Sequence, residues 1–302
     1  MHIYSDKTYL FQGVHLPTCS SWLVVYHPSY QKKALDQLEK CLQQAAIGYS
    51  CLATSGDFAR DLKRLKAFSN DLTRVVVLGG DGTLHLVVNA FAYTAVEVAL
   101  IPCGSGNDFA RQWRVSQAHW LATALRAPAQ RIDLGLINDR YFINVAGVGY
   151  DAEVVRATQN KKGRLARWRY SWEGLKHLYT YSNPQVRVEI DSKVTNQRQL
   201  MCCFANGQFF GGGMKVAPDA NVTSGALSYL SVAQGAPLRQ AVALLLSYIG
   251  AHTRLAQITT AVIKRCEVTT VGLGIEADGE YLGTTPAVIS CQADALLFVV
   301  PR

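Results

Sequence analysis

The sequence has little charge and no ordered cysteine motif, and each absence excludes a class of protein. Only 17% of its 302 residues are charged, while 49% are hydrophobic, which excludes a largely disordered chain. The eight cysteines form no C-x-x-C pair, which argues against a disulfide scaffold and a zinc site. Scattered cysteines in a chain of this size favour reduced thiols in the cytosol. No Gly-Lys pair is present, so the chain has no Walker A loop.

Long apolar segments are also absent. No apolar run approaches the ~20 residues that a membrane-spanning helix needs, and residues 1–10 carry no apolar stretch of signal-peptide length. We therefore expect a cytoplasmic protein that meets membranes only peripherally. The formal net charge of +8 favours an anionic partner, which is a nucleotide, a nucleic acid or an acidic membrane face.

The hydrophobic pattern changes near residue 132. Before it, apolar runs at 22–26, 74–78 and 96–101 alternate with helical spacing at 34–47, 58–68 and 84–91, which predicts a parallel sheet covered on both faces. After it, short β-rich runs predict a mainly antiparallel domain; they cover 140–145, 185–190, 200–205, 226–232, 266–271, 287–291 and 296–300. Helices are expected at 163–181 and 237–254. We expect an α/β domain over 20–132 and a β-rich domain over 133–302, whose last ~10 residues are candidates for packing back on the first domain.

Two glycine-rich loops carry the strongest functional signal. Residues 79–83 (GGDGT) and 104–108 (GSGND) each follow a predicted parallel strand, at the edge of the sheet where ligands bind in open α/β folds. Glycines let the backbone approach a phosphate, and the helix expected after each loop adds its positive end. Asp81 and Asp108 would repel the phosphate unless Mg²⁺ lies between them. Alternatively, the two loops bind no phosphate and are simply tight turns between a strand and a helix.

These loops belong to a recognisable pattern. GGDGT at 79–83 followed by PCGSGNDFAR at 102–111 resembles the diacylglycerol kinase catalytic domain, within the group of soluble bacterial lipid kinases. Further segments match in the same order within residues 22–302; they are 132–135, 142–152, 206–213, 217–220 and 278–280. GGDGT alone is shared with NAD kinases and phosphofructokinases, whereas the GNDFAR segment narrows the resemblance to lipid kinases.

The resemblance implies a Rossmann-like, phosphofructokinase-like nucleotide domain followed by a β-sandwich-like domain, with the active site in the cleft between them. It implies transfer of the γ-phosphate of ATP, with Mg²⁺, to diacylglycerol to give phosphatidic acid. Glu280 matches the family's general base, and Asp81 matches the residue that holds Mg²⁺. The implied nucleotide contacts are Thr54, Gly79, Gly80, Asp81, Gly82, Thr83, Leu84, His85, Gly104, Ser105, Asn107 and Asp108. From its local sequence alone, Glu280 is more simply a solvated residue of an Asp-Gly turn.

The chain departs from the family pattern at three places. Residues 27–31 (HPSYQ) lack the Asn and Gly of the family's first nucleotide loop, and Leu86 replaces an acid after GGDGT. Ser224 stands where many members have an aspartate that binds a structural metal, so this second site is either lost or kept through Asn221 and backbone carbonyls. Because of these departures, a catalytically weak lipid- or nucleotide-binding regulator is one alternative function. A second alternative is a kinase of another lipid alcohol, such as a sphingoid base or phosphatidylglycerol, and a third is an NAD kinase.

Residues 161–176 form a basic and aromatic segment. It holds six basic residues and one acid, interleaved with Trp168, Tyr170 and Trp172. Such a composition suits contact with an anionic membrane surface, single-stranded nucleic acid, or an ordinary solvated helix. Because a lipid kinase must reach its substrate in a bilayer, we expect membrane contact and no nucleic-acid partner. The sequence specifies neither the acceptor lipid nor the oligomeric state.

Overall fold

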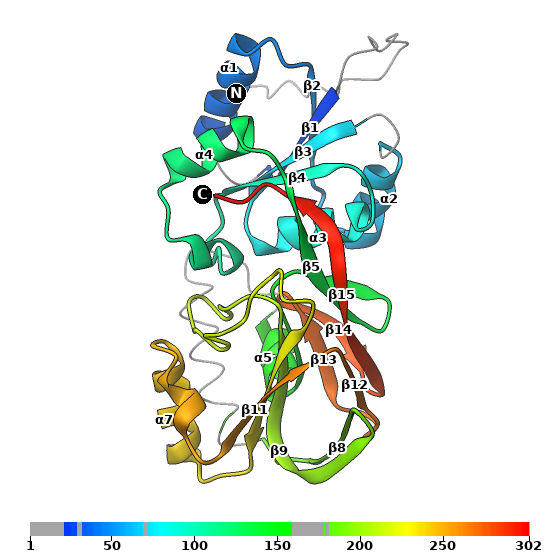
Figure 1. Ribbon diagram of the computed structural model, residues 1–302, viewed down its shortest axis with the longest axis vertical. Coiled ribbons are helices and arrows are strands. Elements are labelled where there is room, and N and C mark those ends of the chain that lie inside the picture. Colours follow the sequence, from blue (N-terminus) through cyan, green and yellow to red (C-terminus); the bar gives the residue numbers. More distant parts are fainter. Residues whose placement is uncertain (1–20, 29–31, 69–71, 159–177, 179–180, 302) are drawn as a thin grey trace, which may run out of the picture.

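The computed structural model describes residues 21–28, 32–68, 72–158, 178 and 181–301. Segment 161–176 lies outside these residues, as does most of the helix predicted at 163–181. The chain forms two halves stacked along the long axis, the N-terminal half at the top of Figure 1 and the C-terminal half below it. No helix in the described part of the chain is both long and apolar enough to span a bilayer.

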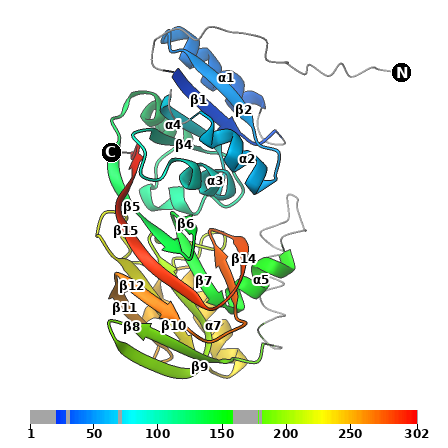
Figure 2. The same cartoon turned by 90° about the vertical axis from the view of Figure 1, so that its right-hand side faces the viewer.

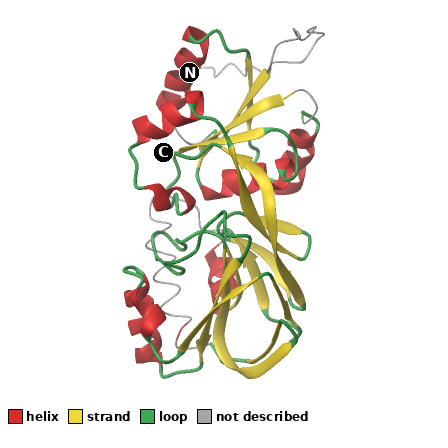
Figure 3. Ribbon diagram, viewed as in Figure 1, coloured by secondary structure: helices red, strands yellow, loops and turns green. Residues whose placement is uncertain are grey.

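The N-terminal half is a parallel sheet with helices on both faces (Figures 1 and 3). Its strands lie in the order β2 (Tyr49–Ala53), β1 (Ser21–Tyr26), β3 (Leu72–Gly79) and β4 (Glu97–Pro102). Because side chains alternate along a strand, Leu23 and Val75 pack with helices α2 (Phe58–Lys66) and α3 (Asp81–Phe91). Val24 and Val76 pack on the other face with α1 (Lys32–Gln44) and α4 (Gln117–Arg126). The predicted α/β fold of this half is confirmed.

The C-terminal half is a β-sandwich, as predicted. One layer contains β14 (Glu280–Thr284), β13 (Gly274–Ala277), β7 (Val145–Gly149), β9 (Lys193–Ala205), β10 (Leu227–Ala233) and β11 (Ile258–Ile263). The other contains β8 (Gln185–Ile190), β12 (Arg265–Val268), β15 (Ala287–Phe298), β5 (Gln130–Ile137) and β6 (Arg140–Phe142). The long β9 serves both layers, because it pairs with β8 at one end and with β7 and β10 at the other (Figure 2).

Strand β15 connects the two halves. It runs antiparallel to β5 and joins the N-terminal sheet beside β4, where Phe298 pairs with Val98. Two strands predicted at 287–291 and 296–300 are therefore one strand, with an irregular register after Gln292 and a left-handed residue at Asp294 (φ 52°). The local break in the apolar pattern is a bulge, which leaves the strand continuous. The domain boundary near residue 132 falls within β5 and stays a prediction.

Other boundaries differ from those predicted for local reasons. The run at 140–145 splits into β6 and β7, and the helix at 237–254 splits into α7 (Pro237–Ser247) and a 3-10 turn (Ala251–Arg254) after Gly250, whose φ is +73°. A glycine at positive φ is a common way for a helix to end. Elements that the pattern did not predict are β2, α4, β5, α5 (Tyr150–Thr158), β11, β13, β14 and the 3-10 helix Phe109–Trp113.

Candidate active site

The two glycine loops lie side by side because the strands before them are neighbours. Gly79 and Pro102 pair at the ends of β3 and β4, and the Cys103 amide donates to the Gly79 carbonyl at 2.8 Å. The backbones then meet at Gly80 and Gly104, where a Cβ on Gly104 would lie 2.5 Å from the Gly80 Cα. Only glycine permits this approach, so the loops are built as one unit.

The first loop opens directly onto the start of α3. Gly80 caps this helix without a side-chain hydrogen bond, and Gly82 is exposed. A Cβ on Gly79 would lie 2.7 Å from Thr83 Oγ1, so the hydroxyl occupies the space above the glycine. Ser105 of the second loop is also exposed. Free amides at a helix start, with hydroxyl groups beside them, can bind phosphate oxygens.

The contact between Gly80 and Gly104 gives a test of this unit. Gly104→Ala is expected to destabilise the fold by about 1–3 kcal/mol and to weaken nucleotide binding, because the backbone of one loop must move. Gly48→Ala is the matched control, since a Cβ there meets nothing within 4 Å. Urea unfolding and nucleotide titration measure both effects. Equal stability and affinity in the two variants would contradict the close approach.

Asp81 and Asp108 fasten the loops to each other and to the C-terminal half. The Asp81 carboxylate accepts the amides of Asp108 and Phe109 at 3.1 and 3.2 Å. Asp108 accepts the Gly212 amide at 2.7 Å and Arg111 Nε at 3.2 Å. Burial and the charge of Asp108 raise the pKa of Asp81 to about 6. The site therefore gathers acidic groups beside the free amides at the start of α3, which favours a cation there.

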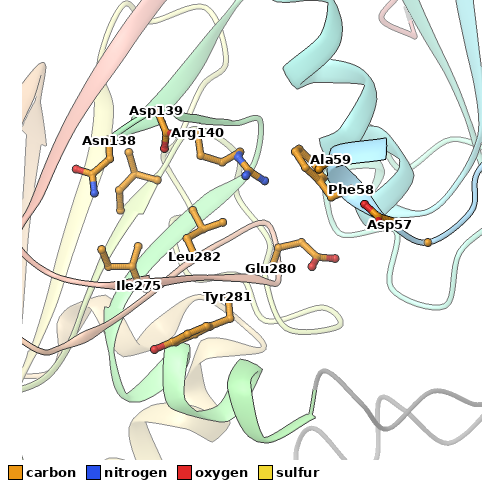
Figure 4. Close-up of a pocket in the computed structure, with 12 residues that line it drawn as sticks. Asp57, Phe58, Ala59, Asn138, Asp139, Arg140, Ile275, Glu280, Tyr281 and Leu282 are labelled. Carbon is orange, nitrogen blue, oxygen red and sulfur yellow. The ribbon is translucent and has the colours of Figure 1, made fainter. Parts of the chain in front are cut away.

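Glu280 comes from the C-terminal half and lies against the first loop. A Cβ on Gly82 would be 3.7 Å from Glu280 Oε1. Glu280 also lines a cavity of about 610 Å³ between the halves (Figure 4). The other lining residues are Gly56, Asp57, Phe58, Ala59, Ile137, Asn138, Asp139, Arg140, Ile275, Tyr281 and Leu282. The Glu280 carboxylate therefore lies at the boundary between the first glycine loop and the cavity.

The cavity has an apolar side and a polar rim. Ile275 and Leu282 lie on the C-terminal side, while Phe58 faces them from the start of α2 (Figure 4). The Arg140 guanidinium stacks over the Phe58 ring at 3.9 Å and bridges the two halves. Burial lowers the pKa of Arg140, while the nearby Asp139 and Glu280 oppose that shift. A ligand with an apolar body and a polar end could fit this lining.

A buried pair, His85 and Asp278, fixes the turn that carries Glu280. His85 Nδ1 lies 2.9 Å from Asp278 Oδ2, and both side chains are almost fully buried. Asp278 also accepts backbone amides at 2.9–3.2 Å; the donors are Ile143, Asn144 and Val145. These bonds connect α3 to the Asp278-Gly279-Glu280 turn, so they set where Glu280 lies.

Asp278→Asn is expected to lower the free energy of unfolding by about 2–4 kcal/mol, because an amide NH₂ would replace an oxygen that accepts buried N–H groups. Asp139→Asn is the control, since Asp139 is exposed in the neighbouring hairpin and surface changes usually stay within about 0.5 kcal/mol. Chemical denaturation measures both. A loss for Asp278→Asn no larger than for the control would show that the buried network contributes little.

The other residues predicted to contact the nucleotide differ in their burial and in their contacts. Thr54 is buried at the end of β2, with an Oγ1 that has no partner among the described residues. Asn107 bonds to both backbone groups of Gly104, so its side chain shapes the loop. Leu84 lies in the core, and its amide donates to the Gly80 carbonyl. His85 contacts Asp278 instead of the loop edge.

Asn221 and Ser224, the predicted second metal ligands, lie in a loop closed by other contacts. Asn221 Oδ1 accepts the amide and hydroxyl of Thr223, and the Ser224 hydroxyl donates to the Ala226 carbonyl. The buried Asp133 carboxylate holds the same loop by accepting the Gly225 amide at 2.6 Å. No cluster of three or more His, Cys, Asp or Glu suited to a metal occurs among the described residues. The metal role of Asn221 and Ser224 stays a prediction.

Sequence reasoning missed several residues that shape the site. The local sequence identifies Asp278 only as part of a turn, and it gives no signal that Arg140 and Phe58 line the cavity. The sole local signal was the Asp-Gly pair before Glu280. Contacts such as His85 with Asp278 span 193 positions, so no local pattern could reveal them.

Comparisons with known proteins agree with this architecture. The diacylglycerol kinase catalytic domain matches residues 21–137, and the YegS C-terminal NAD kinase beta sandwich-like domain matches residues 144–300. A diacylglycerol kinase of Staphylococcus carnosus is 28% identical over 87% of this chain and 90% of its own. A YegS-like lipid kinase of Chromohalobacter salexigens is 30% identical over 73% of each chain.

A solved structure extends the match to the fold. The crystal structure of a diacylglycerol kinase from Bacillus anthracis superimposes with a TM-score of 0.67 at 19% identity, over 93% of this chain and 96% of the other. Both family domains are present in order and together cover most of the chain. The chain therefore belongs to the diacylglycerol kinase catalytic-domain family of lipid kinases.

Proposed function

We propose that this lipid kinase transfers the γ-phosphate of ATP to the hydroxyl group of diacylglycerol and forms phosphatidic acid. The observation that carries the proposal is the position of Glu280. A carboxylate from one half lies next to Gly82 of the glycine loop in the other, and it also lines a cavity that has an apolar side. A base between a phosphate site and an apolar acceptor site is what phosphoryl transfer to a lipid alcohol needs.

The donor would bind along the paired glycine loops. The amides at the start of α3, with Thr83 and the exposed Ser105, would hold the phosphates. Thr54, whose hydroxyl has no partner in the part of the chain that the structure describes, would add a contact. Leu84 and His85 would act through the helix that they build, because both side chains are buried.

The residues at the loops fit Mg²⁺. Their donors are carboxylate oxygens, and Mg²⁺ is commonly held by one or two carboxylates together with substrate phosphates and water. Asp81 is the candidate ligand. When bound, Mg²⁺ would neutralise charge on the phosphates. A single protein carboxylate is compatible with this kind of binding, because water and substrate phosphates can supply the other oxygen ligands of Mg²⁺.

The acceptor hydroxyl would enter from the cavity. Glu280 would accept the hydroxyl proton as the oxygen attacks the γ-phosphorus; the bond to the β,γ-bridging oxygen breaks, and ADP leaves. Ile275 and Leu282 would contact the apolar part of the lipid near its hydroxyl (Figure 4). The His85–Asp278 pair would keep Glu280 at the loop while the substrates exchange.

The test is transfer of label from γ-labelled ATP, with Mg²⁺, to a panel of acceptors in mixed micelles. The panel contains diacylglycerol, a sphingoid base, phosphatidylglycerol and NAD. Label in phosphatidic acid, lost when EDTA removes Mg²⁺, is the expected result. Label in another lipid would keep the kinase and change its substrate. Binding of ATP with no label in any acceptor would favour a regulator.

A further inference from the structure

A row of buried acidic side chains crosses the sheet beneath the Asp278-Gly279-Glu280 turn. Gly147 of β7 pairs with Glu276 of β13 on one side and with Cys203 of β9 on the other. Cross-strand partners project to the same face of a sheet. Glu276 and Cys203 are both at most 1% exposed. The proposed mechanism uses neither of them.

Asp151, in the first turn of α5, fills the space above Gly147. A Cβ on Gly147 would lie 1.5 Å from Asp151 Oδ2, so only glycine leaves room for the carboxylate. Asp151 Oδ2 is 3.9 Å from Cys203 Sγ, and Oδ1 accepts the Ala152 amide at 2.9 Å. The Asp151 carboxylate therefore lies in the row, between Glu276 and Cys203.

No cation balances these acids in the described part of the chain. Arg156 of α5 pairs with Glu153, which is outside the row. The titratable groups that interact with Glu276 or Asp151 include Asp278, Glu280, Cys202, Cys203, Tyr150 and Tyr181. Burial raises the pKa of Asp151 to about 7, and burial with the charge of Asp151 raises that of Glu276. Burial without a balancing cation favours the protonated form of a carboxyl group.

Glu276 also bonds directly to the turn. Its Oε2 accepts the Gly279 amide at 2.9 Å, while Oε1 has no partner among the described residues. Asp278 and Gly279 both have positive φ, at 50° and 85°, as expected for the tight two-residue turn that joins β13 to β14. Asp278 connects the turn to the start of β7 through the Val145 amide. Glu276 binds the turn from within β13 through the Gly279 amide.

We propose that Glu276 is a positioning residue for Glu280: its Oε2 accepts the Gly279 amide and thereby fixes the place of the Glu280 carboxylate. This inference rests on the proposed function, because it assigns Glu280 the task of the base. The required property of Glu276 is an oxygen that accepts from Gly279 at full side-chain length. A negative charge at this position is not required.

Four variants test this property. Glu276→Met removes the acceptor and keeps the length, Glu276→Asp keeps the acid and shortens the side chain, and Glu276→Gln keeps the length and one acceptor oxygen. Glu267→Met is the control, because Glu267 is partly exposed in β12 and pairs with Arg265. Label transfer gives kcat and the KM for ATP, and thermal unfolding checks the fold.

We expect Glu276→Met and Glu276→Asp to lower kcat on the order of 10²-fold, as small misplacements of a catalytic group do. The KM for ATP should stay close to that of the wild type, and Glu276→Gln should recover most of kcat. A fully active Glu276→Met would overturn the inference. The inference would also be overturned if Glu276→Gln lowered kcat as much as Glu276→Asp does. This comparison does not depend on Glu276→Met, so it remains available if that variant fails to fold.

The experiment distinguishes an error in the positioning role of Glu276 from an error in the proposed function. If the wild type is active and Glu280→Gln is not, while the Glu276 variants are fully active, only the positioning role is wrong. If Glu280→Gln is as active as the wild type, or the wild type labels no acceptor, the proposed function is wrong and the positioning role falls with it.

Discussion

Glu280→Gln should bind Mg·ATP as the wild type does and transfer its phosphate about 10²–10⁴-fold more slowly, the usual contribution of a general base. Glutamine keeps the shape of the side chain but cannot take the proton from the acceptor hydroxyl. The wild-type carboxylate lies against Gly82, at the start of α3, so the substitution leaves the phosphate loops intact. Label transfer gives kcat, and a thermal shift with Mg·ATP reports binding.

Glu267→Gln serves as the matched control, because it makes the same chemical change on a partly exposed strand, where Glu267 pairs with Arg265. The control should keep the wild-type kcat. If Glu280→Gln were as active as this control, Glu280 would be a solvated turn residue, as its local sequence alone suggests. If it lost ATP binding together with activity, its role would be in the nucleotide site.

Asp81→Asn should lose activity by on the order of 10²-fold or more, since charge neutralisation by a metal contributes several kcal/mol to such reactions. The variant should also bind ATP equally well with and without Mg²⁺, whereas the wild type should bind better with it. The Asp81 carboxylate accepts the Asp108 and Phe109 amides through different oxygens, so asparagine keeps one of these hydrogen bonds and removes the charge. Thermal unfolding checks that the variant remains folded. Nucleotide titration at several Mg²⁺ concentrations measures the coupling. A variant that keeps the wild-type Mg²⁺ dependence would show that other residues hold the ion.

The same substitution should change how stability depends on pH. The pKa of Asp81 is raised to about 6 in the folded protein, above the value of about 3.9 expected in the unfolded chain. The folded state therefore binds more protons between these values, and this group's contribution to stability falls as pH rises from about 4 to 6. Unfolding of the free protein should depend less steeply on pH in Asp81→Asn than in the wild type. An unchanged slope would show that Asp81 titrates normally.

The sequence was sufficient for the N-terminal fold because its strands are buried on both faces. Val75, Val76 and Val77 are all fully buried, and such continuous runs are typical of central parallel strands. β2 was missed for the opposite reason, since it lies at the edge of the sheet and buries only Leu52. Both glycine loops were located from the strands that precede them.

The parts of the site that escaped prediction depend on distant contacts. His85 meets Asp278, and Asp151 fills the space above Gly147 beside Glu276. Each of these side chains has an ordinary local sequence. Their roles follow from strand order and register, which a single chain does not specify by composition or spacing.

The most direct test of the account is a crystal structure of the protein with Mg²⁺ and a non-hydrolysable ATP analogue. We predict the γ-phosphate between the Gly79–Thr83 loop and Glu280, with the Glu280 carboxylate facing the cavity within reach of an acceptor hydroxyl. The metal should lie between Asp81 and the phosphates. A nucleotide bound elsewhere, or a γ-phosphate too far from Glu280 for an acceptor oxygen to bridge them, would contradict the proposed active site.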